Sequence, residues 1–204
     1  MGVSPEGPWR ATAGAAGTVR IGDSNTVQTL HIPTGLPDLF IGVAVSPDGT
    51  WLATAGTDAT VRIWDATTGQ TRHILTGHTA WVNAVAVSPD GTWLATAGPD
   101  ATVRIWDATT GQTRRTLTGH THAVNAVAVS PDGTWLATAG HDGTVRIWDA
   151  NTGDQLDLCL NEQPGRSCTW TRDWGLFVGG DAGIYAFTFT PVHAGFEVAG
   201  GAGS

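Results

Sequence analysis

A 42-residue repeat dominates the sequence and constrains the fold more than any other feature. Residues 45–86 and 87–128 are identical at 37 of 42 positions when they are aligned without a gap. Residues 129–153 continue in the same register with three differences, and residues 3–44 align less faithfully. A repeat of this length indicates that one supersecondary unit is the building block and that neighbouring units pack side by side to complete the core.

Each unit has the pattern of four short strands. The apolar run Asn83–Val87 predicts an inner strand, strand a, and the sequence Ser-Pro-Asp-Gly after it is typical of a turn. Strand b is predicted over Trp93–Ala97, and strand c, rich in β-branched and aromatic residues, over Thr102–Trp106. A polar outer strand, strand d, is predicted over Gln112–Thr116. The sequence therefore predicts an all-β array of four-stranded antiparallel sheets, one for each repeat.

The repeat resembles that of the WD40 family. A Gly-His pair stands in the loop between strands d and a, at Gly77–His78 and Gly119–His120, and a Trp-Asp pair closes strand c, at Trp106–Asp107 and Trp148–Asp149. The resemblance covers residues 3 to about 188. It implies a β-propeller, in which such sheets, called blades, are arranged radially around a channel. We expect about five blades. These could close as a small ring, but the resemblance implies that a ring of this family most often has seven blades, so we interpret the five as an open arc.

The blades are not equally preserved. Residues 1–44 are predicted to form a degenerate, truncated first blade, residues 45–153 well-formed blades, residues 154–198 a diverged terminal blade, and residues 199–204 a disordered tail. We interpret the missing part of the first strand a and the degenerate sequence of the first blade as the sign of a C-terminal fragment of a larger propeller, with a complete protein as the alternative. An arc would expose blade faces built for burial, so we expect that the chain could self-associate through them.

The resemblance also implies four hydrogen-bonded side chains inside each well-formed blade, here called the tetrad. Its members are the Gly-His histidine, a threonine of strand b, an aspartate of the b–c turn and the strand-c tryptophan. Two complete tetrads are expected: His78, Thr96, Asp100 and Trp106, then His120, Thr138, Asp142 and Trp148. A partial tetrad has Thr54, Asp58 and Trp64, with Leu36 at the histidine position. We expect a structural role, because buried polar groups are costly unless they satisfy one another.

The resemblance places partner binding on the top face, formed by the d–a and b–c loops. The candidate partner-binding residues on this face are Thr57, Trp81, Asn83, Pro99, His122, Asn125 and His141. Trp81 is the sharpest candidate, because an exposed tryptophan is a typical interface anchor, although its ring could instead pack on its own loop. His120 and His122 are spaced like metal ligands, but a tetrad role for His120 argues against a metal site.

Composition and motifs narrow the function. The net charge is −8, with ten arginines and no lysine, which disfavours binding to nucleic acid or to an anionic membrane. The sequence has no nucleophile elbow, phosphate-binding loop or paired-cysteine zinc motif, so we expect no catalytic residue, no metal and no cofactor. The resemblance implies a non-catalytic scaffold that binds a protein or peptide partner. The alternatives are a sensor propeller of a larger bacterial signalling protein with an ATPase or kinase domain and, more remotely, a propeller-type hydrolase.

The sequence also gives expectations about location and the two cysteines. No secretory signal is evident near the N-terminus, and the longest apolar run, Leu39–Val45, is too short to span a bilayer. We therefore expect a cytoplasmic protein, and the lysine-free, alanine- and arginine-rich composition suggests a bacterial source. Cys159 and Cys168 are predicted on an outermost and an innermost strand, too far apart for a disulfide, so we expect two free thiols.

Overall fold

The structure is a computed structural model that describes only part of the chain. The backbone is described for residues 2–3, 9–13, 19–23, 40–160, 163–181 and 183–188, and side chains for residues 40–158, 163–181 and 183–188. Every regular element in these ranges is a β-strand, and the strands form five antiparallel sheets. Within the same ranges there is no helix of the length and apolarity that a membrane crossing needs.

The five sheets follow one another along the chain and are called blades 1 to 5. Blade 1 contains β1 (Gly2–Val3), β2 (Trp9–Ala13) and β3 (Val19–Asp23). Blade 2 contains β4 (Phe40–Val45), β5 (Trp51–Gly56), β6 (Thr60–Asp65) and β7 (Thr71–Thr76). Blade 3 contains β8 (Ala84–Val87), β9 (Trp93–Ala97), β10 (Val103–Asp107) and β11 (Thr113–Leu117). Blade 4 contains β12 (Val124–Val129), β13 (Trp135–Gly140), β14 (Thr144–Asp149) and β15 (Gln155–Leu160). Blade 5 contains β16 (Gly165–Trp170), β17 (Gly175–Gly180) and β18 (Gly183–Thr188).

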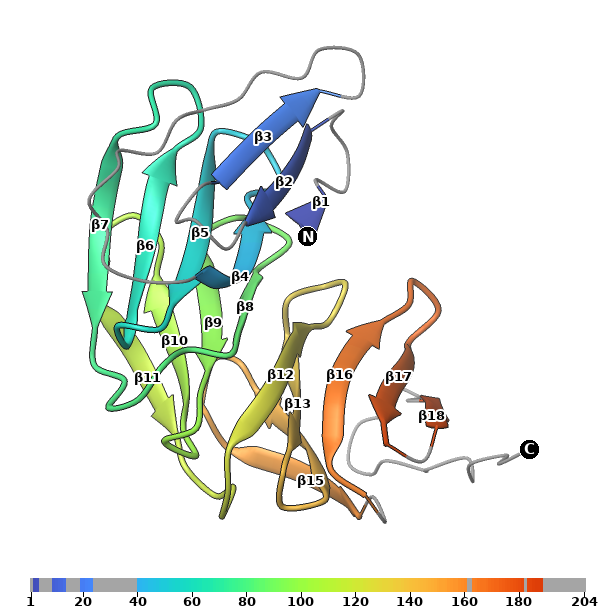
Figure 1. Ribbon diagram of the computed structural model, residues 1–204. Helices are drawn as coiled ribbons and strands as arrows, with labels where there is room; N and C mark the ends of the chain where they lie inside the picture. The colour runs from blue at the N-terminus through green and yellow to red at the C-terminus, as the bar shows by residue number, and fades with distance from the viewer. Residues whose placement is uncertain are drawn as a thin grey trace.

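The blades are arranged as an open arc. Strands pair in chain order within every blade, so each connection between paired strands is a hairpin. The inner strands β4, β8, β12 and β16 lie one beside the next, and blades 1 and 5 stand at the two ends of the arc (Figure 1). The predicted all-β arc of about five blades is therefore confirmed.

Strand bounds in blade 3 agree closely with the sequence pattern. Strand b occupies the predicted residues, whereas strands a, c and d each begin one residue later than predicted. The later start of strand c has a local cause. The amide and hydroxyl of Thr102 both donate to the carboxylate of Asp100, so Thr102 belongs to the turn and strand pairing begins at Val103.

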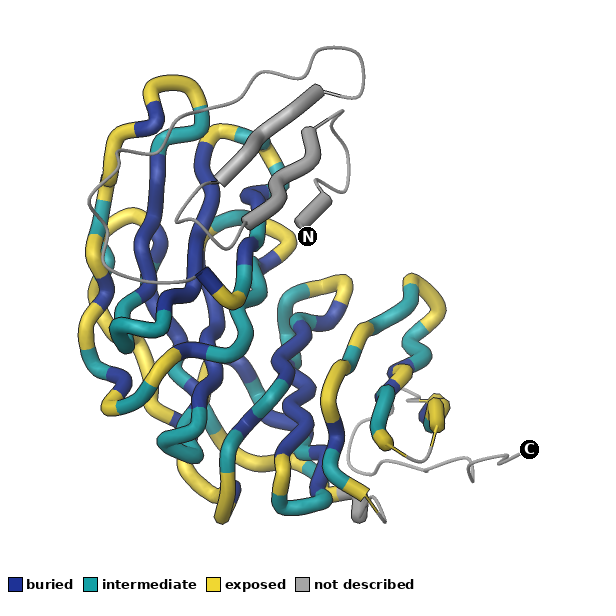
Figure 2. The backbone as a smooth tube through the Cα atoms, viewed as in Figure 1, coloured by how far each residue is buried: buried dark blue, intermediate teal, exposed yellow. Residues whose placement is uncertain are grey.

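The core lies between the blades. One apolar cluster joins Ala53 and Ile63 of blade 2 to Leu94 and Trp106 of blade 3, and similar clusters join blade 3 to blade 4 and blade 4 to blade 5. The middle strands of blades 2 to 4 are therefore buried on both faces, while their outer strands are largely exposed (Figure 2). Each fully buried leucine or isoleucine contributes about 1.5–3 kcal/mol, so no blade is expected to be stable without a neighbour.

The end blades keep the register of the repeat while changing its side chains. In blade 1, Thr12 pairs with Arg20, as Thr54 pairs with Arg62 in blade 2. In blade 5 the buried Phe187 takes the place of the strand-c tryptophan. Residues 189–198 of the predicted terminal blade, the tail at 199–204 and the predicted histidine position of blade 2, Leu36, lie outside the described residues. The domain boundaries remain a prediction.

Candidate functional site

The tetrad of blade 3 is built from two strands and two loops. Nε1 of Trp106 on β10 donates to Oγ1 of Thr96 on β9 over 2.8 Å. The same hydroxyl lies 2.8 Å from Nε2 of His78, which comes from the loop before β8. Nδ1 of His78 lies 2.8 Å from Oδ2 of Asp100 in the β9–β10 turn. The structure thus brings the four predicted side chains into one continuous chain of hydrogen bonds.

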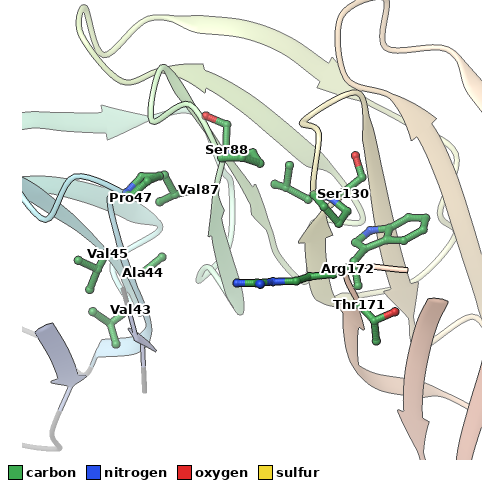
Figure 3. Close-up of a pocket in the computed structure, with 13 residues that line it drawn as sticks. Val43, Ala44, Val45, Pro47, Val87, Ser88, Ser130, Thr171 and Arg172 are labelled. Carbon is green, nitrogen blue, oxygen red and sulfur yellow. The ribbon is translucent and has the colours of Figure 1, made fainter. Parts of the chain in front are cut away.

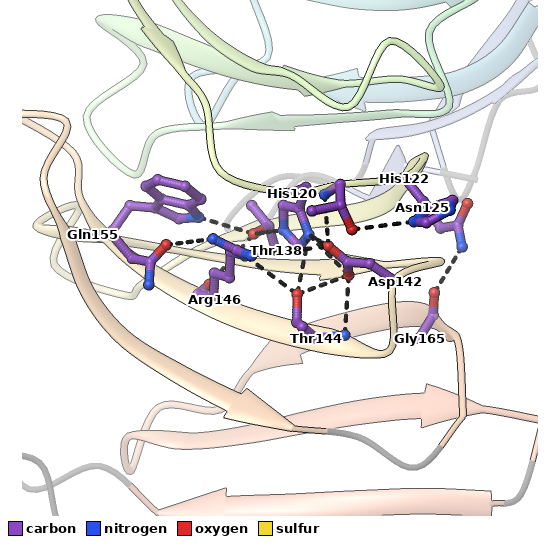
Figure 4. Close-up of polar contacts among 11 residues, drawn as sticks. His120, His122, Asn125, Thr138, Asp142, Thr144, Arg146, Gln155 and Gly165 are labelled. Atoms are coloured by element: carbon purple, nitrogen blue, oxygen red, sulfur yellow. Dashed lines mark hydrogen bonds and ion pairs between the residues drawn. The ribbon is translucent and has the colours of Figure 1, made fainter.

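Blade 4 repeats this arrangement. Nε1 of Trp148 donates to Thr138 over 2.9 Å, and the threonine hydroxyl lies 2.8 Å from Nε2 of His120. Nδ1 of His120 lies 2.9 Å from Oδ2 of Asp142, which also accepts the backbone N–H of Thr121 (Figure 4). The aspartate therefore fastens the loop before the inner strand to the turn between the two middle strands.

The donors and acceptors assign a protonation state to the tetrad. Because the indole N–H of Trp106 donates to Thr96, the threonine hydroxyl is free to donate onward to an unprotonated Nε2 of His78. The proton on Nδ1 then donates to Asp100. Burial lowers the pKa of His78, and the hydrogen bond to Asp100 offsets this only in part. His78 is therefore neutral near pH 7, and the pKa of His120 is lowered by burial in the same way.

The two aspartates are held in their ionised form. Burial alone would raise the pKa of Asp100, but hydrogen bonds from His78, Thr79 and Thr102 outweigh it and lower the pKa. In blade 4 burial also acts to raise the pKa of Asp142, and the backbone hydrogen bond from Thr121 leads the contributions that bring it down to about 2. Each tetrad consequently pairs a neutral imidazole with a carboxylate that accepts several N–H and O–H groups.

The tetrads are enclosed, which limits what they can do chemically. Thr96 and Thr138 are 0% exposed, and both histidine side chains are 1% exposed. A threonine nucleophile needs access to a substrate as well as a neighbouring base. The chemistry available to these groups is mutual satisfaction of buried donors and acceptors, and their effect is to fix the loops of the top face.

Blade 2 contains the predicted partial tetrad with a different partner for the aspartate. Nε1 of Trp64 donates to Thr54 over 2.9 Å, as in the complete tetrads. Asp58 accepts hydrogen bonds from Thr60 and forms an ion pair with Arg62 at 2.7 Å. Burial would raise the pKa of Asp58, but these contacts lower it. The role of Arg62 as the partner of Asp58 was not predicted from the sequence. The signal that could have revealed it is the leucine at position 36, because without a histidine there the carboxylate of Asp58 needs another donor.

The top-face candidates lie at the loops where the resemblance placed them, with unequal exposure. Trp81 is 52% exposed in the loop before β8, so about half of its surface is open to solvent. Its carbonyl oxygen lies so close to Gly98 that a Cβ on this glycine would approach it to 2.6 Å, which ties the loop to the β9–β10 turn. His122 and His141 are also exposed, whereas Thr57 and Pro99 are half-buried.

Asn83 and Asn125 connect neighbouring blades. Nδ2 of Asn83 donates to the carbonyl of Val124 over 3.0 Å, and Nδ2 of Asn125 donates to the carbonyl of Gly165 over 2.8 Å. The pairing of β12 with β13 skips Asn125, which makes it the extra residue of a β-bulge. A bulge redirects a side chain, here toward the next blade. Both amides are half-buried and already engaged, which makes them weaker candidates for partner contact than Trp81.

Blade 5 replaces this asparagine with arginine. Arg166 occupies the bulge position of β16 and forms an ion pair with Asp181, which lies in the β17–β18 turn. Asp181 is exposed, unlike the tetrad aspartates. This surface pair was not anticipated from the sequence, because Arg166 becomes equivalent to Asn125 only when the bulge is known.

The remaining reactive groups show no assembled site within the described residues. No cluster of three or more His, Cys, Asp or Glu side chains could hold a metal ion there. His120 is engaged in its tetrad, and the exposed His122 contacts only the hydroxyl of Thr121 among the hydrogen bonds found. Cys168 is a free thiol whose Sγ donates to the carbonyl of Ala137, and burial raises its pKa to about 12, so the thiolate is suppressed. The side chain of Cys159 lies outside the described residues.

Comparison with known protein families identifies the repeats. The family model described as WD domain, G-beta repeat matches residues 37–65, 69–107 and 111–149, which together make up just over half of the chain. Comparison with curated protein sequences gives no match. The matched segments contain strands b and c of blades 2, 3 and 4, including the tryptophans of the two complete tetrads and of the partial tetrad. On this evidence the chain belongs to the WD40-repeat family.

Proposed function

We propose that this chain is a non-catalytic interaction module that binds a protein or peptide through its top face. WD40 repeats generally mediate protein–protein interaction, which supports the broad assignment. The observation that carries the choice of surface is Trp81, a tryptophan 52% exposed on a loop whose Thr79 N–H donates to Asp100 of the β9–β10 turn. A rigid aromatic side chain loses little conformational entropy on binding and fills a partner's pocket with a large apolar area.

The rest of the surface supports this proposal by its chemistry. His122 and His141 lie exposed on the loops of the adjoining blade and would supply hydrogen bonds at the rim. The tetrads support the same loops from below, because the carboxylates of Asp100 and Asp142 accept backbone N–H groups from them. A preformed loop surface reduces the ordering cost of association.

A comparative affinity experiment tests the assignment. The purified chain, Trp81→Ala and a matched control, Ile74→Ala, are used as baits against an extract from the source cell. Ile74 is 57% exposed but lies on the outer strand β7, away from the top face. We expect partners that bind the wild type and Ile74→Ala to be lost with Trp81→Ala, with a loss of affinity of about thirtyfold, corresponding to about 2 kcal/mol. An unchanged set of partners with Trp81→Ala would remove the top face as the binding surface.

A further inference from the structure

A recess lies at the end of the inner strands that is opposite the top face. It has a volume of about 660 Å³ and is lined by the last residues of β4, β8, β12 and β16 and by the turns that follow them (Figure 3). The top-face loops precede these strands, so the recess and the top face are at opposite ends of the same four strands. It is therefore separate from the surface proposed above.

Blades 2, 3 and 4 supply an apolar wall. Each contributes valine and proline side chains from the same repeat positions, such as Val87 and Pro89. The serine between them offers no polar group to the recess, because Ser88 is 0% exposed and its hydroxyl bonds within its own turn. Asp90, which follows in the turn, accepts hydrogen bonds from Ser88 and Thr92 and is not part of the lining.

Blade 5 breaks this repetition in a specific way. Trp170 and Arg172 stand where the preceding blade has Val129 and Pro131. Arg172 is the one charged side chain among the lining residues, and it forms no ion pair with any residue that the structure describes. Its side chain extends into the recess toward the residues of β4 (Figure 3). The recess thus combines an apolar wall with a single available guanidinium.

The turn that carries Arg172 is held in a strained but well-packed conformation. Trp174 has φ of 62°, where the equivalent residue of blade 4, Gly133, has φ of 76°. A bulky residue in this region costs about 1–2 kcal/mol, and such strain persists where the surroundings over-determine it, often at functional sites. The ring of Trp174 packs on Trp135 with centroids 5.3 Å apart, and Trp135 packs on Trp170 at 6.4 Å. These contacts fix the turn and the aromatic wall beside Arg172.

We propose that this recess binds a small organic anion. The acidic group would pair with Arg172, whose planar guanidinium matches a carboxylate or sulfonate through two parallel hydrogen bonds. The apolar body of the ligand would pack against Trp170 and the valines and prolines of blades 2 to 4. The volume of the recess lies within the range of about 300–1,000 Å³ that is usual for small-molecule sites. Charge complementarity decides the class of ligand, since the lining residues that the structure describes include a cation and no carboxylate.

Binding of two related dyes tests the proposal. The probes are 1-anilinonaphthalene-8-sulfonate, an apolar anion whose fluorescence rises in apolar sites, and N-phenyl-1-naphthylamine, which has the same ring system without the acidic group. We expect the anionic dye to bind the full chain at one site and to bind at least about tenfold more weakly to Arg172→Gln, because a charge-assisted contact is lost. The neutral dye should bind both proteins alike. Arg172→Lys should retain part of the preference for the anion.

Matched variants separate this site from general effects of charge and exposed surface. Arg115→Gln removes an exposed arginine of β11 and should leave both dyes unaffected, as should Trp81→Ala on the top face. Val87→Phe should exclude both dyes by filling the recess. Equal affinity of the anionic dye for the wild type and Arg172→Gln would overturn the proposal, as would equal weakening by Arg115→Gln. Arg172→Gln does not change the top face, and Trp81→Ala does not change the recess. Failure of the anion-binding proposal is therefore distinguishable from failure of the proposed top-face function.

Discussion

Blades 2 and 3 come from nearly identical sequence but hold their turn aspartates differently. In blade 3 the carboxylate of Asp100 accepts a hydrogen bond from His78, whereas in blade 2 Asp58 pairs with Arg62. The arginine is present in both blades, yet no ion pair between Arg104 and Asp100 is found among the described residues. Arg104 instead lies over the ring of Trp106, with its guanidinium carbon 5.9 Å from the ring centroid.

Blade 4 shows an intermediate arrangement. Arg146 donates to Gln155 and Thr144, while its Nη2 stays 4.0 Å from Asp142, which is already occupied by His120 (Figure 4). The comparison teaches that the histidine decides where the arginine goes. An ionised carboxylate in a half-buried turn attracts whichever donor is available, so one residue in the preceding loop changes the partners of both the aspartate and the arginine.

The largest expected difference concerns the threonine at the centre of each tetrad. Thr96→Val keeps the shape of the side chain but leaves both Trp106 Nε1 and His78 Nε2 without a partner, which should lower the free energy of unfolding by about 3 kcal/mol. Thr54→Val leaves only Trp64 without a partner and should cost about half as much. Urea unfolding of the two variants measures the difference. Equal losses in the free energy of unfolding would show that the hydrogen bond between the histidine and the threonine hydroxyl contributes nothing to stability.

Acid should weaken the blades that contain histidine. The pKa of His78 and of His120 is lowered in the folded state by burial, so below the unfolded value of about 6.5 the unfolded chain binds more protons. Stability is therefore full above pH 6.5 and is lost as the pH falls below it, by at most about 1.4 kcal/mol per pH unit for each histidine.

Urea unfolding between pH 7.5 and pH 5 checks this prediction. Replacement of His78 and His120 by leucine, the residue at the equivalent position for blade 2, should flatten the pH dependence in this window. The exposed His122 provides the control, and His122→Gln should keep the wild-type slope. A slope that persists in the double leucine variant would assign the acid sensitivity to other groups.

A smaller effect should separate the two arginines. Arg62→Gln removes the ion pair to Asp58 and is expected to cost about 1 kcal/mol, since the pair is mostly shielded from solvent. Arg104→Gln removes a contact with an aromatic ring and no ion pair among the described residues, and it should cost about 0.5 kcal/mol. A double-mutant cycle with Asp58→Asn measures the coupling in blade 2. Absence of coupling there would mean that Thr60 alone holds the aspartate.

The smallest expected difference between blades 2 and 3 concerns a turn residue whose effect the two blades should share. Ala59 and Ala101 have φ of 63° and 61°, and the same turn position in blade 4 is Gly143. Glycine adopts this conformation without steric cost, so Ala59→Gly and Ala101→Gly should each stabilise the chain, by up to about 1 kcal/mol. Thermal unfolding should show equal gains, and Gly143→Ala should show the reverse. Unequal gains would indicate that the blades differ beyond their aspartate partners.

The repeat predicted most of the fold because every blade meets the same local demands. The strand register and the turn residues follow from a pattern that recurs in each unit, whereas the meeting of His78 with Thr96 is what the resemblance to WD40 repeats implied. The contacts that escaped prediction depend on what lies beside the unit. The inter-blade hydrogen bond of Asn125 requires a bulge, which spacing does not reveal, and the ion pair of Arg62 requires a missing histidine. The recess beside Arg172 arises only when four inner strands converge.

The inter-blade contacts of blade 3 have a consequence for how such a chain can change in length. The amide of Val82 donates to the carbonyl of Gly56 across one junction, and Val124 donates to Gly98 across the next. Donor and acceptor at the second junction both lie 42 positions after those at the first. A whole 42-residue repeat could therefore be duplicated or deleted by recombination. The new junction between blades would still pair the same donor position with the same acceptor position.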